Sequence, residues 1–213
     1  MELFSINNIL TTIWGYDVTL IELIAVVASF VAIVLAKRNN LWTFIIGLLS
    51  SSTYFAFFYQ QHLYCMMVLQ IIFVGIDFYG LINWIQPRQK QELPITKMKW
   101  KNFELLAIIT TIAGIAIGFG MKALGQLYPE QLPLSSYPIS DAVIMTANIV
   151  GQVLLAQRKI DNWYVWIMID IFSVIIWSLM GMWLTTILYV TYLIISITAI
   201  HTWNKQLNEK QYA

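Results

Sequence analysis

The feature that most constrains this chain is a series of seven long apolar stretches separated by short polar segments. A helix needs about 20 mainly apolar residues to cross the hydrocarbon core of a bilayer, and each stretch is close to that length. They cover residues 19–36, 41–59, 63–85, 104–120, 140–156, 162–181 and 183–203. The sequence therefore predicts an all-α integral membrane protein with seven transmembrane helices, folded as a single membrane domain over residues 1–213.

The composition excludes several classes of protein. Only 11% of the residues are charged, against about 25% in soluble proteins, and a net charge of +1 provides no basic surface for nucleic acid. Cys65 is the single cysteine, so neither a disulfide framework nor a metal site is expected. No nucleophile elbow, zinc-protease motif or phosphate-binding loop is present, so we predict neither an enzyme nor a bound cofactor.

The positions of the positive charges predict the direction of insertion. Of the 12 lysines and arginines, only Lys122 falls in segments on the same side as the N-terminus, and the positive side of a membrane protein faces the cytoplasm. We therefore expect an external N-terminus, a cytoplasmic C-terminus and an odd number of spans. The weakly apolar residues 1–18 are expected to form an interfacial helix lying on the membrane.

The two ends of the chain resemble each other at a separation of about 120 residues. The matching elements are Ala36-Lys37-Arg38 with Ala156-Gln157-Arg158, Trp42 with Trp163, and Trp84 with Trp203. Residues 19–85 and 140–203 would then form two three-helix bundles joined by a linker helix at 104–120. Because one crossing joins them, the bundles would be parallel repeats, a transporter design with its substrate site near the middle of the membrane.

Gly114 and Gly118 give the linker helix a small-xxx-small pattern. This spacing permits close helix approach, either to one of the bundles or to a neighbouring protomer. An apolar, glycine-containing helix also produces the pattern by chance, and the sequence does not decide between these readings.

Polar and aromatic residues share one face of the predicted helix at 162–181. Trp163, Trp166, Asp170, Ser173 and Trp177 fall within one stripe at helical spacing. A carboxylate between aromatic rings is suited to a flat, cationic ligand, because rings attract cations over their faces. The alternatives are an interfacial anchor for Trp163 and a structural carboxylate for Asp170.

Other candidate ligand contacts lie at membrane depth on neighbouring helices. Gln70 and Asp77 are seven residues apart, Asn148 and Gln152 lie one turn apart, and Tyr189 shares a face with Tyr192 and Ser196. Such groups usually face the interior of a bundle. They would either bind the polar edges of a ligand or bond helix to helix, and hydroxyl groups most often satisfy local carbonyls.

Several segments together resemble bacterial vitamin transporters of the PnuC type, the nicotinamide riboside transporters. The strongest is Asn162-Trp163-Tyr164-Val165-Trp166-Ile167-Met168-Ile169-Asp170. The others are residues 4–10, Leu63-Tyr64, Leu69-Gln70, Tyr79-Gly80 with Trp84, Pro138-Ile139-Ser140-Asp141-Ala142, Gly181 and Leu188-Tyr189. Their order and spacing extend the resemblance over nearly the whole chain.

The resemblance implies a 3-1-3 helix arrangement similar to that of sugar-efflux (SWEET-like) transporters, a homotrimer, and a bacterial cytoplasmic membrane. It implies facilitated diffusion of a vitamin precursor that intracellular phosphorylation then traps. By matching positions, Trp163, Trp166 and Asp170 correspond to the ligand-binding motif of the family, and Gln70 to a polar pocket position. The family usually has Asn where this chain has Asp170.

Three functional hypotheses follow. Nicotinamide riboside is the first expected substrate, and thiamine, which some relatives carry, is the alternative, because both are flat cations. Trp163 and Trp166 would stack the ring, Asp170 would neutralise it, and Gln70, Asn148, Gln152 and Tyr189 are the remaining predicted contacts. A proton-coupled vitamin symporter with Asp170 or Asp77 as relay, and a membrane assembly that transports nothing, are the competing hypotheses.

Overall fold

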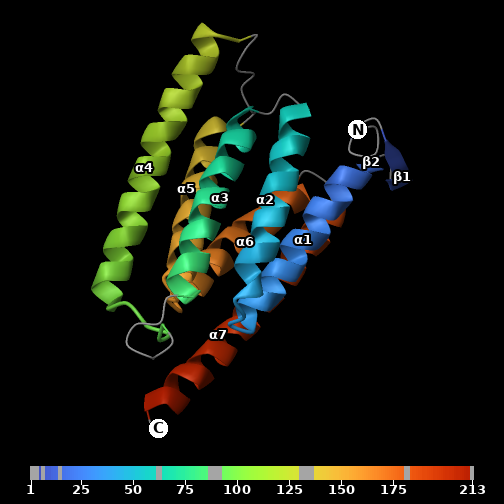
Figure 1. The fold of residues 1–213 in the computed structure, drawn as a ribbon. Coiled ribbons are helices and arrows are strands. Elements are labelled where there is room, and N and C mark those ends of the chain that lie inside the picture. Colours follow the sequence, from blue (N-terminus) through green and yellow to red (C-terminus); the bar gives the residue numbers. More distant parts are fainter. Residues whose placement is uncertain are drawn as a thin grey trace. The chain divides into compact units, whose positions relative to one another are not determined.

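A computed structural model describes residues 5, 8–13, 16–60, 64–85, 93–129, 137–179 and 183–211. This part of the chain contains seven helices and one short β-hairpin (Figure 1). The elements are β1 (Ile9–Ile13), β2 (Tyr16–Thr19), α1 (Leu20–Lys37), α2 (Trp42–Gln60), α3 (Tyr64–Ile85), α4 (Trp100–Leu127), α5 (Pro138–Ala156), α6 (Asn162–Leu179) and α7 (Trp183–Gln211). The chain divides into two compact units, Met1–Leu93 and Pro94–Ala213, and each is described by itself.

Each of the seven predicted spans corresponds to one helix, but two helices are much longer than predicted. Six of the described helices are long and apolar enough to cross a membrane, and α6 contributes a shorter apolar segment, Asn162–Ile176. Both α4 and α7 extend beyond the predicted spans at polar ends. In α7 the extension includes Lys205 and Glu209, whose charged groups lie 3.9 Å apart at helical i,i+4 spacing. A span predicted from hydropathy ends where charged residues begin. The helix itself continues where the charged residues have high helix propensity, as Lys and Glu do.

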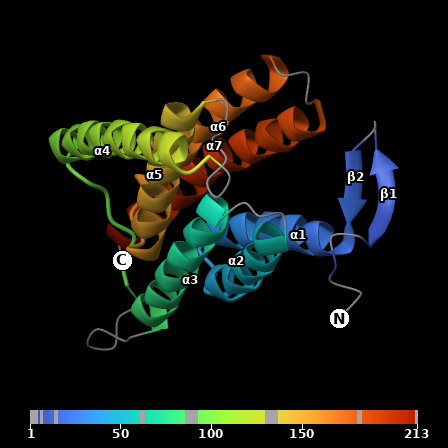
Figure 2. The same cartoon turned by 90° about the horizontal axis from the view of Figure 1, so that it is seen from above.

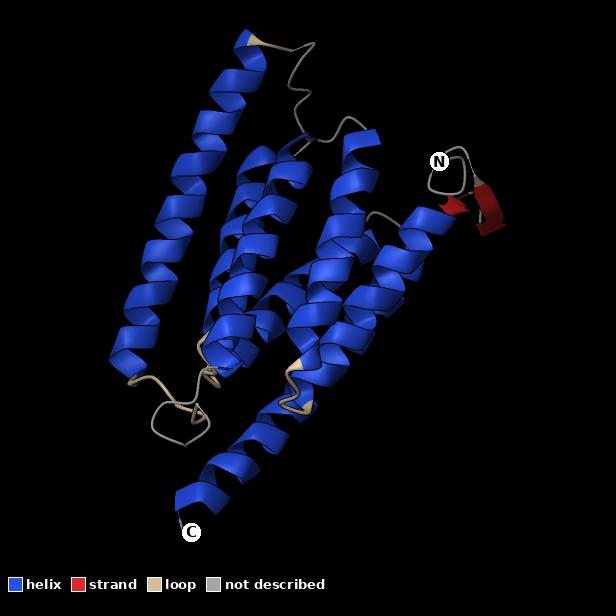
Figure 3. Cartoon of the chain, in the orientation of Figure 1, coloured by secondary structure: helices blue, strands red, loops and turns tan. Residues whose placement is uncertain are grey.

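The interfacial helix expected over residues 1–18 is wrong for the described residues of that segment. Strands β1 and β2 form a short hairpin, drawn in red in Figure 3. They pair antiparallel, with Ile13 opposite Tyr16 and Thr12 opposite Asp17. Four of the five residues of β1 are Ile or Thr, and β-branched side chains favour strands over helices. The segment is apolar, but its residue types favour a hairpin over a helix. The remaining residues of the segment lie outside the described part of the chain.

In the first unit, α2 packs against both α1 and α3. Helix α1 begins after Thr19, whose hydroxyl accepts the backbone N–H of Glu22 at 3.4 Å. Two hydroxyls of α2 then donate across the interface to backbone carbonyls of α1: Thr43 to Ala32 at 2.9 Å and Ser50 to Ala25 at 3.1 Å. Such bonds hold the helices together where no water is present to satisfy a polar group.

In the second unit, α4 and α5 run in opposite directions (Figure 1) and pack against each other. Figure 2 shows the two helices from above. A Cβ atom on Gly114 would lie 2.6 Å from the Cα atom of Val143, and one on Gly118 would lie 2.6 Å from the Cα atom of Ile139. Both distances are too short for any side chain other than hydrogen. Of the two readings of this glycine pair, the structure supports close packing, and the partner is α5.

The α1–α2 and α5–α6 turns have the same backbone hydrogen bonds, shifted by 119 positions. Each contains one residue in the left-handed region, Asn39 with φ 55° and Arg158 with φ 57°. The bonds of the first turn run from the N–H groups of Arg38, Asn39, Asn40, Thr43 and Phe44, and those of the second from Gln157, Arg158, Lys159, Asn162 and Trp163. The acceptors match at the same shift. The two units thus share one turn geometry, while the parallel 3-1-3 arrangement stays a prediction.

This register corrects two of the matches expected from the sequence. Arg38 aligns with Gln157 and not with Arg158, so the tripeptide match is shifted by one residue, and the match of Trp42 with Trp163 is also wrong. Phe44, and not Trp42, is the counterpart of Trp163. Both Phe44 and Trp163 are fully buried, whereas Trp42 is 58% exposed. Phe44 contacts Trp84 edge to face at 4.9 Å, and Trp163 contacts Trp203 edge to face at 5.7 Å. The pairing of Trp84 with Trp203 holds at the shift of 119, so a buried aromatic pair follows the turn in each unit.

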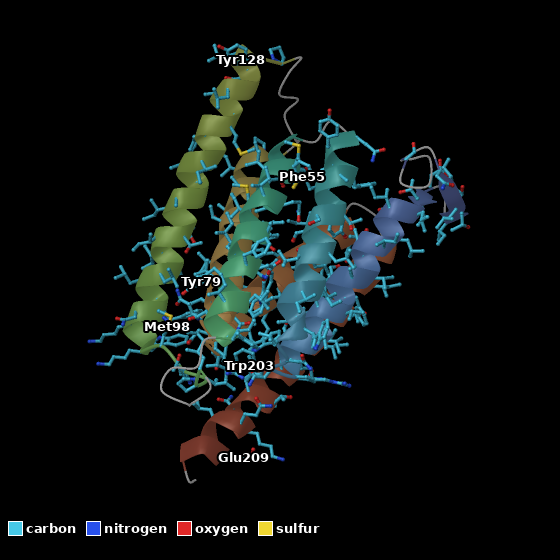
Figure 4. The ribbon with its side chains drawn as sticks, in the orientation of Figure 1. Phe55, Tyr79, Met98, Tyr128, Trp203 and Glu209 are labelled. Atoms are coloured by element: carbon cyan, nitrogen blue, oxygen red, sulfur yellow. The ribbon has the colours of Figure 1, made fainter. Side chains whose placement is uncertain are left out.

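The segment before α4 is bound to the α5–α6 turn within the second unit. Thr96 donates its N–H to the carbonyl of Arg158 at 3.1 Å and accepts the N–H of Ile160 at 2.9 Å. Two residues on, the N–H of Met98 donates to the buried carboxylate of Asp161 at 2.8 Å. Met98 and Tyr128 mark opposite ends of α4 in Figure 4, so this binding fixes the end of α4 that adjoins the turn.

We expect Asp161→Ala to release this segment. The variant removes a charge-assisted hydrogen bond at a site only 3% exposed, and bonds of this kind contribute about 1.5–3 kcal/mol. Hydrogen exchange followed by mass spectrometry should show faster exchange over residues 93–99. Asp17→Ala is the matched control, because it removes a carboxylate whose hydrogen bond from Thr12 is exposed. Unchanged protection in Asp161→Ala would show that the two backbone bonds suffice.

Candidate functional site

The predicted polar stripe of α6 is buried in the second unit. Asp170, at the middle of the helix, is 3% exposed, and Ser173 is 4% exposed. Helix α6 packs against both α5 and α7, so this face is enclosed by protein. The side chain of Trp177 lies outside the described part of the chain. A buried carboxylate halfway along an apolar helix is costly and marks this stripe as the candidate site.

Asp170 is held from α7. The hydroxyl of Ser196 donates to Asp170 Oδ2 at 3.1 Å, and Ser196 is fully buried. Among the described residues, Ser196 is the hydrogen-bond donor to the Asp170 carboxylate. Helical spacing placed Ser196 on the face of Tyr189 and Tyr192. A bond to its own helix was expected for Ser196, because hydroxyl groups in membrane helices usually satisfy local carbonyls. Here the hydroxyl bonds a neighbouring helix instead.

The ring of Trp166 lies against α5 at Gly151, a residue without a side chain. A Cβ atom on Gly151 would lie 3.2 Å from Trp166 Cε2 and 3.3 Å from Cζ2, which is closer than ordinary van der Waals contact, so the absence of a side chain at Gly151 makes room for the indole. The Trp166 side chain is only half-buried. It is one turn from Asp170 on the same stripe. Trp166 therefore combines exposed ring surface with a nearby carboxylate.

Trp163 occupies a different environment. It is fully buried and packs edge to face against Trp203 of α7, which lies on the C-terminal part of that helix (Figure 4). Its indole nitrogen has no hydrogen-bond partner in the described part of the chain. Phe44 and Trp84 repeat this packing in the other unit. A ligand stacking on Trp163 would first require Trp203 to move.

The remaining predicted contacts of the second unit are half-buried side chains on α5 and α7. Asn148 donates to the Ile144 carbonyl of its own helix at 2.7 Å, which leaves its amide oxygen as an acceptor. Gln152 lies one turn further and directly follows Gly151, the residue covered by Trp166. The ring of Tyr189 contacts that of Tyr192 edge to face at 6.0 Å.

Two of the candidate polar residues belong to α3 in the first unit. Gln70 is 7% exposed and Asp77 is 1% exposed. The Asp77 carboxylate lies against α2, because a Cβ atom on Gly47 would be 2.8 Å from Asp77 Oδ2. Among the residues that the structure describes, no group of three His, Cys, Asp or Glu is arranged to hold a metal ion.

Long apolar helices that enclose buried polar groups are typical of multi-pass membrane proteins with a functional site at membrane depth. Comparison with protein families identifies the kind of membrane protein. The model of the nicotinamide mononucleotide transporter family matches residues 19–205. The chain belongs to this family, and it is therefore a multi-pass membrane transporter and not an enzyme.

Individual relatives agree with this assignment. The nicotinamide riboside transporter PnuC of Escherichia coli (strain K12) is 26% identical over 233 residues, covering 99% of this chain and 97% of that protein. The riboflavin/roseoflavin transporter RibM of Streptomyces davaonensis is 23% identical over 156 residues, covering 72% of this chain and 70% of its own length. The crystal structure of the vitamin B3 transporter PnuC has the same fold, with a TM-score of 0.61 and 21% identity over 87% of this chain and 81% of that one.

Proposed function

We propose that this protein takes up a flat aromatic vitamin precursor, with nicotinamide riboside as the first substrate. The observation that carries the proposal is the buried Asp170 one turn from the half-buried ring of Trp166. The nicotinamide ring of the riboside is a flat cation, and an aromatic face with a nearby carboxylate attracts such a group. The name of the Escherichia coli relative supports the same substrate.

Each predicted contact has a role in this proposal. Trp166 stacks the ring, Asp170 neutralises its charge, and Asn148 and Gln152 bind polar edges. Gln70 and Tyr189 are further proposed contacts. Trp163 is retained as a proposed contact of the motif, with the condition that Trp203 moves away from its ring.

The membrane arrangement is also a proposal. We infer seven transmembrane helices in two parallel three-helix bundles with α4 as linker, an external N-terminus and a cytoplasmic C-terminus. The excess of cations on one side supports this orientation, and the shared turn geometry of the two units supports the repeat. By family resemblance we propose a homotrimer in a bacterial cytoplasmic membrane, transport by facilitated diffusion, and trapping of the product by phosphorylation.

A second candidate substrate is thiamine, which carries the same charge on a flat ring. The substitution of Asp for the usual Asn at position 170 favours cations in general and does not select between the two. Riboflavin, named for a relative from Streptomyces davaonensis, is a neutral ring system, and Asp170 offers it no charge complement.

Titration of the purified protein with nicotinamide riboside, thiamine and riboflavin tests the proposal. Binding next to Trp166 is expected to quench tryptophan fluorescence, with nicotinamide riboside binding most tightly. Trp166→Phe should remove most of the quenching, whereas Trp100→Phe is the control because Trp100 is 63% exposed at the start of α4. Absence of binding by all three vitamins would refute the proposed function.

Transport in proteoliposomes separates facilitated diffusion from proton coupling. Facilitated diffusion equilibrates the vitamin across the membrane. Accumulation above equilibrium under an imposed pH difference would instead favour the symporter, with Asp170 or Asp77 as the proton-binding group.

A further inference from the structure

The residue types of Asp170 and Ser196 are found at the aligned positions of the first unit, but exchanged. At the shift of 119 positions that aligns the two turns, Asp170 corresponds to Ser51 and Ser196 corresponds to Asp77. All four side chains are buried: Asp170 is 3% exposed, Ser51 6%, Ser196 0% and Asp77 1%. Each unit therefore places one Asp and one Ser at the same two positions, but on opposite helices.

This exchange shows whether the helix packing itself requires an Asp at the position of Asp170. In the first unit, the position equivalent to Ser196 holds the carboxylate of Asp77, so the helix packing common to both units does not demand an acid on the middle helix. The position equivalent to Trp166 is Gly47 in that unit, and the Asp77 carboxylate lies against it. The positions of Trp166 and Asp170 on the middle helix are Gly47 and Ser51 in the first unit, so the combination of an aromatic ring and a carboxylate at these two positions belongs to the second unit.

We propose that Ser196 is a positioning residue, which fixes the Asp170 carboxylate so that its charge faces a cationic group of the substrate. The inference rests on the proposed function. A carboxylate rotates easily about its last bond, and a hydroxyl has a single proton to donate. By donating to Oδ2 from α7, Ser196 restrains this rotation and leaves the lone pairs of Oδ1 for the ligand.

The test measures dissociation constants of the full-length protein for nicotinamide riboside, thiamine and riboflavin. Ser196→Ala is expected to weaken binding of the two cations about tenfold, the size expected for losing one charge-assisted hydrogen bond, and to leave riboflavin unaffected. In an Asp170→Asn background, the same Ser196→Ala change is expected to alter cation binding by less than about twofold, since the two groups act as one unit.

Ser178→Ala is the matched control. Its hydroxyl donates to the Val174 carbonyl of its own helix, so the variant removes a serine hydroxyl from the same unit without touching Asp170. Ser196→Thr keeps a hydroxyl donor and should keep the selectivity for cations. Thermal unfolding of each variant shows whether the fold is intact.

An exchange variant separates positioning from simple helix bonding. Asp170→Ser combined with Ser196→Asp keeps the α6–α7 pair in the order found in the first unit. It should be as stable as the starting protein but bind cations no better than Asp170→Asn. Wild-type affinity in the exchange variant would overturn the proposal, as would equal weakening of riboflavin and cation binding by Ser196→Ala. Failure of the wild-type protein to bind any vitamin would instead refute the proposed function.

Discussion

Asp170→Asn is expected to weaken binding of nicotinamide riboside and thiamine by about 10- to 100-fold. The variant keeps the size of the side chain and removes its charge at a site only 3% exposed. A hydrogen bond to a charged group contributes about 1.5–3 kcal/mol. Loss of that free energy corresponds to this range of about 10- to 100-fold in dissociation constants. Isothermal titration of the purified protein measures the change directly.

Binding of neutral riboflavin provides the internal comparison for this prediction. Its dissociation constant should change by less than about threefold in Asp170→Asn, because no ion pair is lost. Asp141→Asn is the matched control, since Asp141 lies in the first turn of α5 and is only half-buried. Unchanged binding and uptake of both cationic vitamins by Asp170→Asn would exclude Asp170 from substrate recognition.

Gly118→Val is expected to destabilise the protein by about 2 kcal/mol or more. The first atom of the new side chain would lie 2.6 Å from the Cα atom of Ile139, and a backbone atom cannot move aside as a flexible side chain does. Overpacking of a close interface costs about 1–3 kcal/mol, and close approach is the main source of helix association in membranes. Unfolding in sodium dodecyl sulfate, followed by circular dichroism, measures the loss.

Gly120→Ala in the same helix is the control for this prediction. A Cβ atom at Gly120 would meet nothing within 4 Å, and replacing a helical glycine by alanine gains about 0.5–1 kcal/mol of helix propensity. The two substitutions should therefore shift stability in opposite directions. A stabilised Gly118→Val protein would mean that α4 and α5 are not closely packed at this point.

Most of the fold could be predicted because the bilayer dictates the length of an apolar helix. The features that could not be predicted are those that the thickness of the bilayer does not determine. The ends of α4 and α7 are polar, so hydropathy stops before the helix does. The strands Ile9–Ile13 and Tyr16–Thr19 are too short for a periodic signal, and their apolar composition alone suggested a helix.

The sequence predicted which residues of α6 share one face, but not which residues of neighbouring helices contact them. Helical spacing places Trp166 and Asp170 on one face of α6, and the structure keeps them there. Spacing within one helix does not give the rotation of its neighbour, so the bond from Ser196 to Asp170 could not be derived. The register of the repeat was also ambiguous, because Trp42 and Phe44 are both aromatic and only burial distinguishes them.

The binding of residues 96–98 to the α5–α6 turn has a mechanical consequence. Three hydrogen bonds join the start of α4 to the start of α6, and the glycine contacts join α4 to α5. These three helices are therefore coupled mainly through backbone atoms, with the Asp161 carboxylate as the one side-chain acceptor. The contacts described between α6 and α7 are made by side chains. Transport requires some elements to move while others stay fixed. Within this unit we expect the backbone-coupled helices to act as the frame and α7 as the element able to shift against it.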